Sequence, residues 1–223
     1  MTKTIKIAAT TISVGGVAVG SGFGIHHLTK EETSSTDNSK LEKKSVTPSN
    51  SFSISLGASV LNLDGGSDQI QWTSRLEELK NVSSDLPEDL IALKTEKTWK
   101  DLQVWCSRNS NNSFEREDAP DFRNFKSFCT WKVGDKTWDK KIDANKEATH
   151  EDWGTAHAKL KAKQGVEEAN LSEGLKTAKQ ATATENNHED RKAMHLWCTS
   201  AYKEMWTDDN AKSFLEVKEY CRT

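Results

Sequence analysis

The sequence predicts a mainly α-helical protein with an N-terminal transmembrane helix, a polar tether and two tandem helical units that each contain one disulfide. Three observations predict this fold class. A Trp-Cys motif occurs twice, apolar residues recur at the spacing of one helix face, and only three prolines interrupt the chain. No turn joins two alternating apolar runs, which argues against an all-β fold.

Composition limits both the core and the partners. Hydrophobic residues make up 34% of the chain, below the roughly 45–50% of typical globular proteins. The core must therefore depend on large side chains, and the sequence has eight Trp and seven Phe. The formal net charge of -3 indicates no basic surface, so no nucleic-acid partner is predicted.

Residues 1–28 predict a membrane anchor or signal segment. Lys3 and Lys6 precede an uncharged run at residues 7–25, which as a helix would be about 28 Å long, enough to cross a hydrocarbon core. Because both lysines precede the run, we expect a single-pass cell-membrane protein whose C-terminal region is extracellular. The alternative is a secreted protein released by cleavage near Gly20.

The same segment contains a stripe of small residues. Gly16, Gly20 and Gly24 lie four positions apart, the spacing of closely packed transmembrane helices, so self-association through this face is one interpretation. The other is that small residues are simply common in such segments. No cysteine lies near the end of the run, which excludes a lipoprotein cleavage site.

Residues 29–71 predict a Ser/Thr-rich tether. Its first part has almost nothing to bury and is expected to be disordered. Phe52, Ile54 and Leu56 then alternate with serines, which is the period of a short strand or extended segment. Such a strand could not be stable alone and would have to lie on the folded part of the chain.

The helical body is predicted as two repeats, at residues 72–131 and 153–223, joined by a connector at residues 132–152. Trp72 and Trp153 open the repeats and are 81 residues apart, whereas the two Trp-Cys motifs are 92 residues apart. The second repeat therefore contains additional residues, and we expect them in the polar stretch 180–190.

All four cysteines belong to the repeated motif. The step from Cys106 to Cys198 equals the step from Cys129 to Cys221, so duplication gives each repeat its own pair. We therefore predict the disulfides Cys106–Cys129 and Cys198–Cys221, each worth roughly 3 kcal/mol in the chain-entropy account. A zinc site of four thiolates is the rival interpretation, but zinc sites usually contain closely spaced cysteine pairs, which this chain lacks.

No set of residues predicts catalysis, a cofactor or a metal. The chain has no His-Glu-x-x-His, no Gly-x-Ser-x-Gly and no glycine-rich phosphate loop with a lysine. The tripeptide His-Glu-Asp occurs at residues 150–152 and 188–190, where acid–base chemistry is one interpretation. Because both tripeptides precede predicted helices, we prefer the interpretation that they cap the helices and interact with their dipoles.

Tryptophans that recur in both repeats are predicted to lie in the core. Trp105 and Trp197 are expected at equivalent buried sites, each beside the disulfide of its own repeat. Trp138 has no counterpart in the other repeat and is predicted to be an exposed contact.

The plan of the chain resembles the uncharacterised paralogous membrane and surface proteins of haemotropic mycoplasmas. The matching parts are the apolar segment at residues 3–25, the polar spacer, and the aromatic–Cys motif within residues 217–223. The resemblance implies a membrane or surface location and antigenic diversification, and it implies no catalytic residues.

These features favour display as the function. A surface-displayed helical protein would act in host interaction or antigenic variation, with a host or surface protein as its partner. One alternative is an exported enzyme, a hydrolase or nuclease whose site is not visible in the sequence. Another is a structural partner of a second membrane protein.

Overall fold

The computed structural model describes residues 50–83, 86–184 and 187–223. Contacts divide the chain into residues 1–44 and residues 45–223, and every described residue belongs to the second part. The predicted anchor, its glycine stripe and the first part of the predicted tether lie outside the described residues. Within the described ranges, no helix has both the length and the apolar content that crossing a membrane requires.

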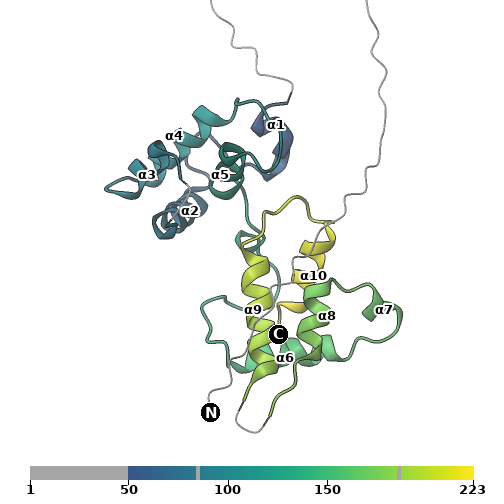
Figure 1. Cartoon of the computed structure of the whole chain (residues 1–223). Coiled ribbons are helices and arrows are strands. Elements are labelled where there is room, and N and C mark those ends of the chain that lie inside the picture. The colour runs from purple at the N-terminus through teal and green to yellow at the C-terminus, as the bar shows by residue number, and fades with distance from the viewer. Residues whose placement is uncertain (1–49, 84–85, 185–186) are drawn as a thin grey trace, which may run out of the picture. The chain divides into compact units, whose positions relative to one another are not determined.

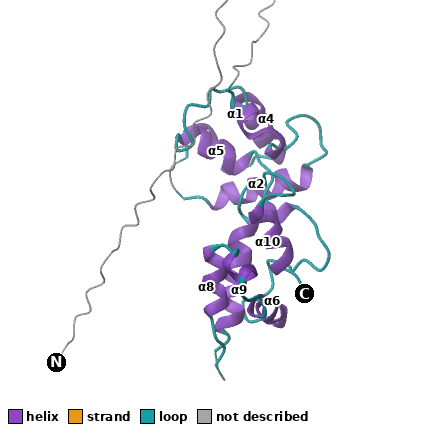
Figure 2. Cartoon of the chain, turned by 90° about the vertical axis from the view of Figure 1, so that its right-hand side faces the viewer, coloured by secondary structure: helices purple, strands orange, loops and turns teal. Residues whose placement is uncertain are grey.

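Helices and loops make up the described residues, which contain no strand (Figures 1 and 2). The mainly α-helical fold is therefore confirmed for this part of the chain. The α-helices are α1 (Phe52–Leu56), α2 (Gln69–Asn81), α3 (Glu88–Ile91), α4 (Trp99–Asn109), α5 (Pro120–Phe128), α6 (Glu151–Lys161), α7 (Val166–Ala169), α8 (Glu173–Gln180), α9 (Glu189–Tyr202) and α10 (Lys212–Tyr220). Short 3-10 helices occupy Gly57–Ser59, Ala92–Lys94 and Val133–Asp135.

Local sequence explains where two of the longer helices begin. Thr98 and Asp101 form a capping box at the start of α4, in which the Asp101 carboxylate accepts the Thr98 N–H at 2.8 Å. These hydrogen bonds from Thr98 hold the pKa of Asp101 below its ordinary value. Pro120 occupies the first turn of α5, where its missing N–H would have no partner within the helix.

The helices build two separate hydrophobic cores. We call residues 50–131 the N-unit and residues 131–223 the C-unit, and the buried clusters of the two units share no residue. Trp72 and Trp153 are each 0% exposed, and each indole N–H donates to a main-chain carbonyl of its own unit. The equivalent core positions are Phe52 and Val133, Leu61 and Ile142, Leu79 and Leu160, Leu102 and Met194, Phe122 and Phe214, and Phe128 and Tyr220.

Equivalent main-chain hydrogen bonds extend the repeat beyond its predicted boundaries. The N–H of Leu61 donates to the carbonyl of Cys129 at 2.9 Å, and the N–H of Ile142 donates to the carbonyl of Cys221 at 3.0 Å. In a second equivalent pair, the N–H of Phe52 donates to the carbonyl of Asn112, and the N–H of Val133 donates to the carbonyl of Glu204. In a third, the N–H of Phe114 donates to the carbonyl of Asn50, and the N–H of Trp206 donates to the carbonyl of Trp131. Each unit thus begins with a segment that pairs with the end of the same unit.

Trp131 belongs to both units. Its N–H donates to the carbonyl of Ser59 at 2.8 Å, a bond that closes the N-unit. Its own carbonyl accepts the N–H of Trp206 at 2.9 Å, a bond that opens the C-unit. The ammonium of Lys136 lies between the two indoles, 4.0 Å from the ring centroid of Trp131 and 3.7 Å from that of Trp206.

The segments predicted as part of the tether and as a connector are instead the first parts of the two units. Residues 50–71 contribute Phe52 to the N-unit core, and residues 132–152 contribute Ile142 to the C-unit core. The predicted strand is wrong, because α1 occupies its place. Ile54 is 54% exposed, so the alternation of apolar residues there does not mark one buried face.

Both predicted disulfides are present. Cys106–Cys129 joins α4 to the end of α5, and Cys198–Cys221 joins α9 to the end of α10. No cysteine is free. The two bridges connect equivalent helices, as the duplication requires.

Part of the additional sequence of the C-unit lies in the stretch where it was predicted. Residues 181–188 connect α8 to α9, whereas only residues 95–98 separate the corresponding elements of the N-unit.

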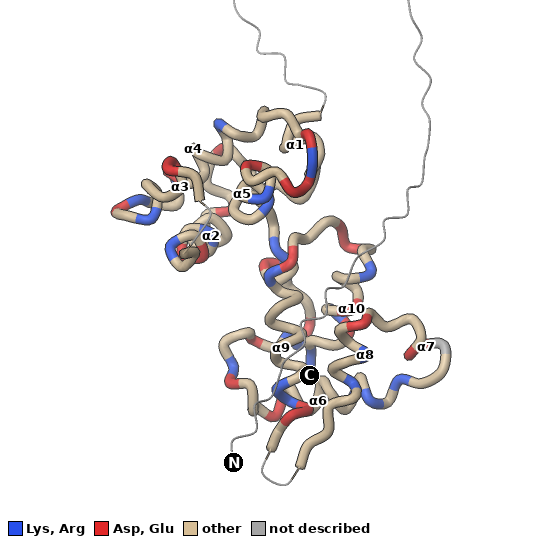
Figure 3. The backbone as a smooth tube through the Cα atoms, viewed as in Figure 1, with Lys and Arg blue, Asp and Glu red and all other residues tan. Residues whose placement is uncertain are grey.

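Charged residues of both signs are interspersed along the helices of both units (Figure 3). The helix surfaces therefore carry mixed charge, as the composition indicates.

Candidate functional site

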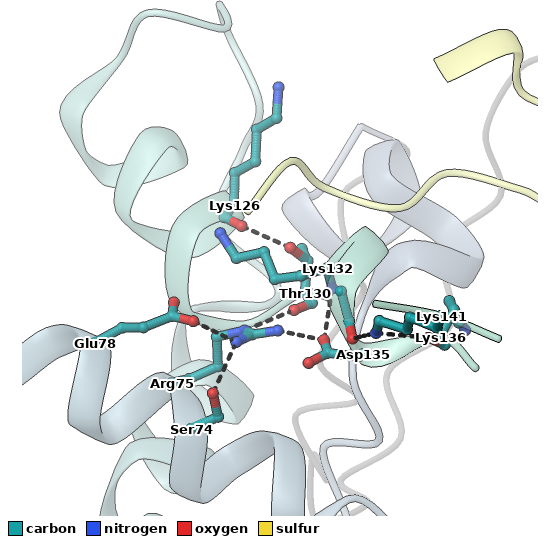
Figure 4. Close-up of polar contacts among 10 residues, drawn as sticks. Ser74, Arg75, Glu78, Lys126, Thr130, Lys132, Asp135, Lys136 and Lys141 are labelled. Carbon is teal, nitrogen blue, oxygen red and sulfur yellow. Dashed lines mark hydrogen bonds and ion pairs between the residues drawn. The ribbon is translucent and has the colours of Figure 1, made fainter. Parts of the chain in front are cut away.

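A charged cavity lies where α2 of the N-unit approaches the first residues of the C-unit. Figure 4 shows the polar contacts among residues of its wall. We call it the inter-unit cavity, and its volume is about 820 Å³. Ligand sites commonly have volumes of roughly 300–1,000 Å³ and commonly lie between domains. The titratable and hydroxyl side chains that line it are Ser74, Arg75, Glu78, Lys132, Asp135, Lys141, Asp143, His195, Thr199, Tyr202 and Lys203.

Arg75 is a buried charge in the wall of this cavity. Its side chain is 1% exposed, and its Nε donates to the carbonyl of Thr130 at 3.2 Å. Its Nη1 donates to Glu78 at 2.7 Å, and its Nη2 donates to Asp135. A buried guanidinium is tolerated only when it is paired and hydrogen-bonded, and these three acceptors satisfy that requirement.

Asp135 connects the two units through this ion pair. Its carboxylate, 13% exposed, also accepts the N–H of Lys132 at 2.7 Å. Glu78 is the more exposed partner of Arg75, at 42%. Solvent screens the Glu78 pair more strongly, so Asp135 is the partner that matters most to the buried guanidinium.

Three lysines of the cavity, Lys132, Lys141 and Lys203, lack a carboxylate partner among the described residues. The ammonium of Lys141 donates to the carbonyls of Gly134 and Lys136, the latter at 3.0 Å. The side chain of Lys132 makes no hydrogen bond or ion pair with a described residue, and no dashed line ends at its ammonium in Figure 4. Burial lowers the pKa of Lys132 and the pKa of Lys141, because desolvation disfavours their charged forms.

Tyr202 forms another part of the wall. Its hydroxyl donates to the carbonyl of Ile142 at 3.0 Å, and burial raises the pKa of Tyr202 well above its ordinary value, with a further increase from the Asp143 carboxylate. The main chain of Gly134 packs directly on Tyr202, since a Cβ at Gly134 would lie 2.9 Å from the Tyr202 carbonyl oxygen. This wall is therefore close-packed and rigid.

Trp138 lies elsewhere than the sequence predicted. Its ring packs edge-on against Tyr202, with centroids 5.7 Å apart, and against Phe214, with centroids 6.1 Å apart. Its indole N–H is buried and has no partner among the described residues. Trp138 is therefore partly buried and not freely exposed as expected, because the supposed connector is part of the C-unit and packs Trp138 against that core.

Trp105 and Trp197 differ in their surroundings. Trp105 is 6% exposed, and its indole N–H donates to Asp89 at 2.7 Å. Trp197 is only half-buried and lines an apolar cavity of about 630 Å³ between α8 and α9, where a Cβ on Gly174 would lie 2.9 Å from the indole. The prediction of a buried site is therefore confirmed for Trp105 and wrong for Trp197, whose indole N–H has no such acceptor among the described residues.

The His-Glu-Asp tripeptides lie at helix starts, as preferred from the sequence. The Nδ1 of His150 accepts the N–H of Asp152 at 3.2 Å, which caps α6. His188 stands at the equivalent position before α9, whose first turn contains Glu189 and Asp190. Among the described residues, no group of three or more His, Cys, Asp or Glu side chains is arranged to hold a metal ion.

The inter-unit cavity is suited to binding a polar molecule. Its charged groups come from three segments that are distant in sequence, so no short sequence motif contains them. One sequence signal was available: Arg75 follows Trp72 by three positions on the buried face of α2, where the C-unit has Ala156. A charge at a core position of one repeat marks a function or an interface that the other repeat lacks.

No protein-family model matches the chain, and neither the search of curated proteins nor that of solved structures gave a match.

Proposed function

We propose that the chain is an exported binding protein, displayed on the outer side of a membrane for host interaction or antigenic variation. The observation that carries this proposal is the use of cysteine, since all four cysteines form two structural disulfides. Disulfides persist in oxidising compartments and are rare in the cytosol. The apolar run at residues 7–25 and the resemblance to mycoplasma surface proteins support attachment to a membrane.

Binding, rather than catalysis, is the activity that the geometry favours. The inter-unit cavity is polar, and the cavity beside Trp197 is apolar, so the chain offers two chemically different recesses. Among the described residues that line them, the hydroxyl of Thr199 donates to the carbonyl of His195 at 2.7 Å and not to a general base. The hydroxyl of Tyr202 likewise bonds to a carbonyl.

Surface labelling of intact cells tests the location. The full chain is produced in a host cell and treated with a membrane-impermeant amine reagent, and the cells are then divided into membrane, soluble and medium fractions. Free thiols are alkylated at lysis, so that disulfides formed in the cell are preserved for peptide mapping. The expected result is a labelled, membrane-bound chain with Cys106–Cys129 and Cys198–Cys221 peptides.

A variant that lacks residues 1–28 is the matched control, and we expect it to stay in the cytosol with reduced cysteines. A full-length chain that is unlabelled and reduced in the soluble fraction would refute export. A labelled chain in the medium whose N-terminus lies near Gly20 would refute anchoring and leave the secreted alternative.

A further inference from the structure

We propose that the inter-unit cavity is a binding site for a small polyhydroxylated organic anion, whose oxyanion is held by the ammonium groups of Lys132 and Lys203. Nothing in the proposed display function requires such a ligand, so this inference stands separately from it.

The carboxylates of the cavity are largely committed. Asp135 and Glu78 both accept from the guanidinium of Arg75, and Asp143 accepts the N–H of Asn145 at 2.9 Å. Lys132, which is half-buried, and Lys203, which is exposed, line the same cavity, and neither ammonium pairs with a described carboxylate. The lining contains four cationic side chains, of Arg75 and three lysines, and three carboxylates, so one positive charge has no counter-charge and an anion is the ligand that complements it.

The two lysines lie near each other and border a common space. Both line the inter-unit cavity and also a second cavity of about 490 Å³ on the side of α5. Lys132 is half-buried, and burial of an ammonium without a partner is unfavourable. A bound oxyanion would remove this penalty, because a charge-assisted hydrogen bond favours the protonated lysine.

The rest of the lining supplies partners for hydroxyl groups. The imidazole of His195 packs edge-on against Trp153 with centroids 5.3 Å apart, and it makes no hydrogen bond with a described residue. The ammonium of Lys141 uses two of its three donors on carbonyls, which leaves one. Asp143 still has its second carboxylate oxygen as an acceptor. A polyol attached to the anion fits this mixture of donors and acceptors.

Comparison of the repeats separates this site from an ordinary charged surface. The equivalent residues of the C-unit and the N-unit are Lys132 and Ser51, Asp135 and Ile54, Lys141 and Val60, His195 and Gln103, and Lys203 and Asn111. Every titratable residue in this set stands where the N-unit has an uncharged one. The folds are equivalent, so folding alone does not require these charges; they are specific to the side of the C-unit that faces Arg75.

Calorimetric titration and thermal unfolding of the full-length, disulfide-intact protein test the proposal. The probes are gluconate and glucose 6-phosphate, which carry a carboxylate or a phosphate on a six-carbon polyol. Glucose supplies the uncharged polyol, and sodium chloride at equal ionic strength supplies the anion control. We expect one or both anionic probes to bind and to raise the melting temperature, while glucose and chloride do neither. Binding of gluconate alone identifies a carboxylate ligand, and binding of glucose 6-phosphate alone identifies a phosphate.

Three lysine variants show where the anion binds. Lys132→Gln and Lys203→Gln should each weaken probe binding by about tenfold or more, the loss of one charged hydrogen bond. Lys126→Gln is the matched control, because it removes the same charge from a neighbouring lysine whose ammonium points away from the cavity (Figure 4). Far-ultraviolet circular dichroism and disulfide mapping establish that each variant folds.

Three results would overturn the proposal. The first is no stronger binding of either anionic probe than of chloride. The second is equal binding of glucose and gluconate, which would indicate recognition of the polyol alone. The third is an equal loss of affinity in the Lys126 variant, which would indicate general attraction of anions to the surface.

Discussion

Arg75 and Asp135 show how a single pair of residues adapts a duplicated fold. At the position of Arg75, the C-unit has Ala156, which is 0% exposed within its own core. The N-unit instead places a guanidinium there and directs it to Thr130 of its own chain segment and to Asp135 of the C-unit. The pair therefore links the units, although it adds nothing to either hydrophobic core.

Removal of the buried partner should cost more than removal of the exposed one. Asp135→Ala leaves Nη2 of Arg75 without an acceptor, and we expect a loss of about 3 kcal/mol in unfolding free energy, near the lower end for broken buried pairs. Glu78→Ala should cost less than about 1 kcal/mol, because that pair is partly exposed. Denaturant unfolding of both variants measures the difference. Equal losses would show that Asp135 has no special role.

Tyr202 should make stability decrease in alkaline solution. Burial raises the pKa of Tyr202 above its ordinary value of 10.0, so the unfolded chain releases this proton at lower pH than the folded protein. Its contribution to stability is complete below pH 10.0 and is lost as the pH rises from there toward the folded pKa.

The variant Tyr202→Phe isolates this effect. At neutral pH it should lose about 1 kcal/mol with the hydrogen bond to Ile142. Above pH 10.0 the variant should lose less stability than the wild type, since the buried phenol is gone. Parallel stability curves for the two proteins above that pH would contradict the assignment.

At the scale of elements, each unit is a set of short helices held by one disulfide. The cysteines of both bridges are 23 positions apart, and both bridges join the penultimate long helix to the end of the last one. Short helices are marginal by themselves, so their stability comes from the packed face and from the bridge.

Loss of either disulfide should therefore have a similar cost. Cys106→Ser with Cys129→Ser, and Cys198→Ser with Cys221→Ser, should each lower the unfolding free energy of the affected unit by about 3 kcal/mol, because the closed loops are equal in length. Calorimetry of the two double variants measures the shifts in melting temperature. A bridge whose removal leaves the melting temperature unchanged would contradict this account.

The sequence predicted the elements that depend on repetition and on helical spacing. The Trp72 and Trp153 pair, the disulfides and the helices that carry Phe122, Phe125 and Phe128 were all predictable, since buried apolar residues recur there at fixed offsets. The helix α1 was not, because its five residues bury little more than Phe52 and show no helical period.

The cavity was not predictable for a different reason. Its side chains are brought together by the approach of α2 to residues 132–145, and nothing local in either segment encodes that contact. Only the unexpected Arg75 on an apolar helix face indicated that another element supplies a partner. Its partner Asp135 lies in residues 132–152, which the repeat spacing predicts to be a connector.

At the scale of the whole described molecule, two separate hydrophobic cores lie in one chain. The hydrophobic clusters share no residue, and the units are joined covalently through Trp131 and by the Arg75–Asp135 pair. Damage to one core should therefore remain within its unit.

Core truncations in the two units should act independently. Trp72→Ala and Trp153→Ala should each cost about 3–5 kcal/mol in the unit that contains the residue, and the costs should add in the double variant. Hydrogen exchange followed by mass spectrometry should show lost protection in residues 50–131 for the first variant and in residues 132–223 for the second. Loss of protection across both ranges in either single variant would show that the units fold as one body.

The equivalent main-chain hydrogen bonds of the two units have a consequence for recognition by antibodies. The common course of the backbone is held by peptide groups, by the cysteines and by core side chains such as Trp72 and Trp153, all of which are hidden. Exposed positions are free to differ, and the exposed Glu77 in one unit indeed corresponds to the exposed Ala158 in the other. An antibody that contacts the surface of one unit should therefore fail to cross-react with the other, although both present the same scaffold.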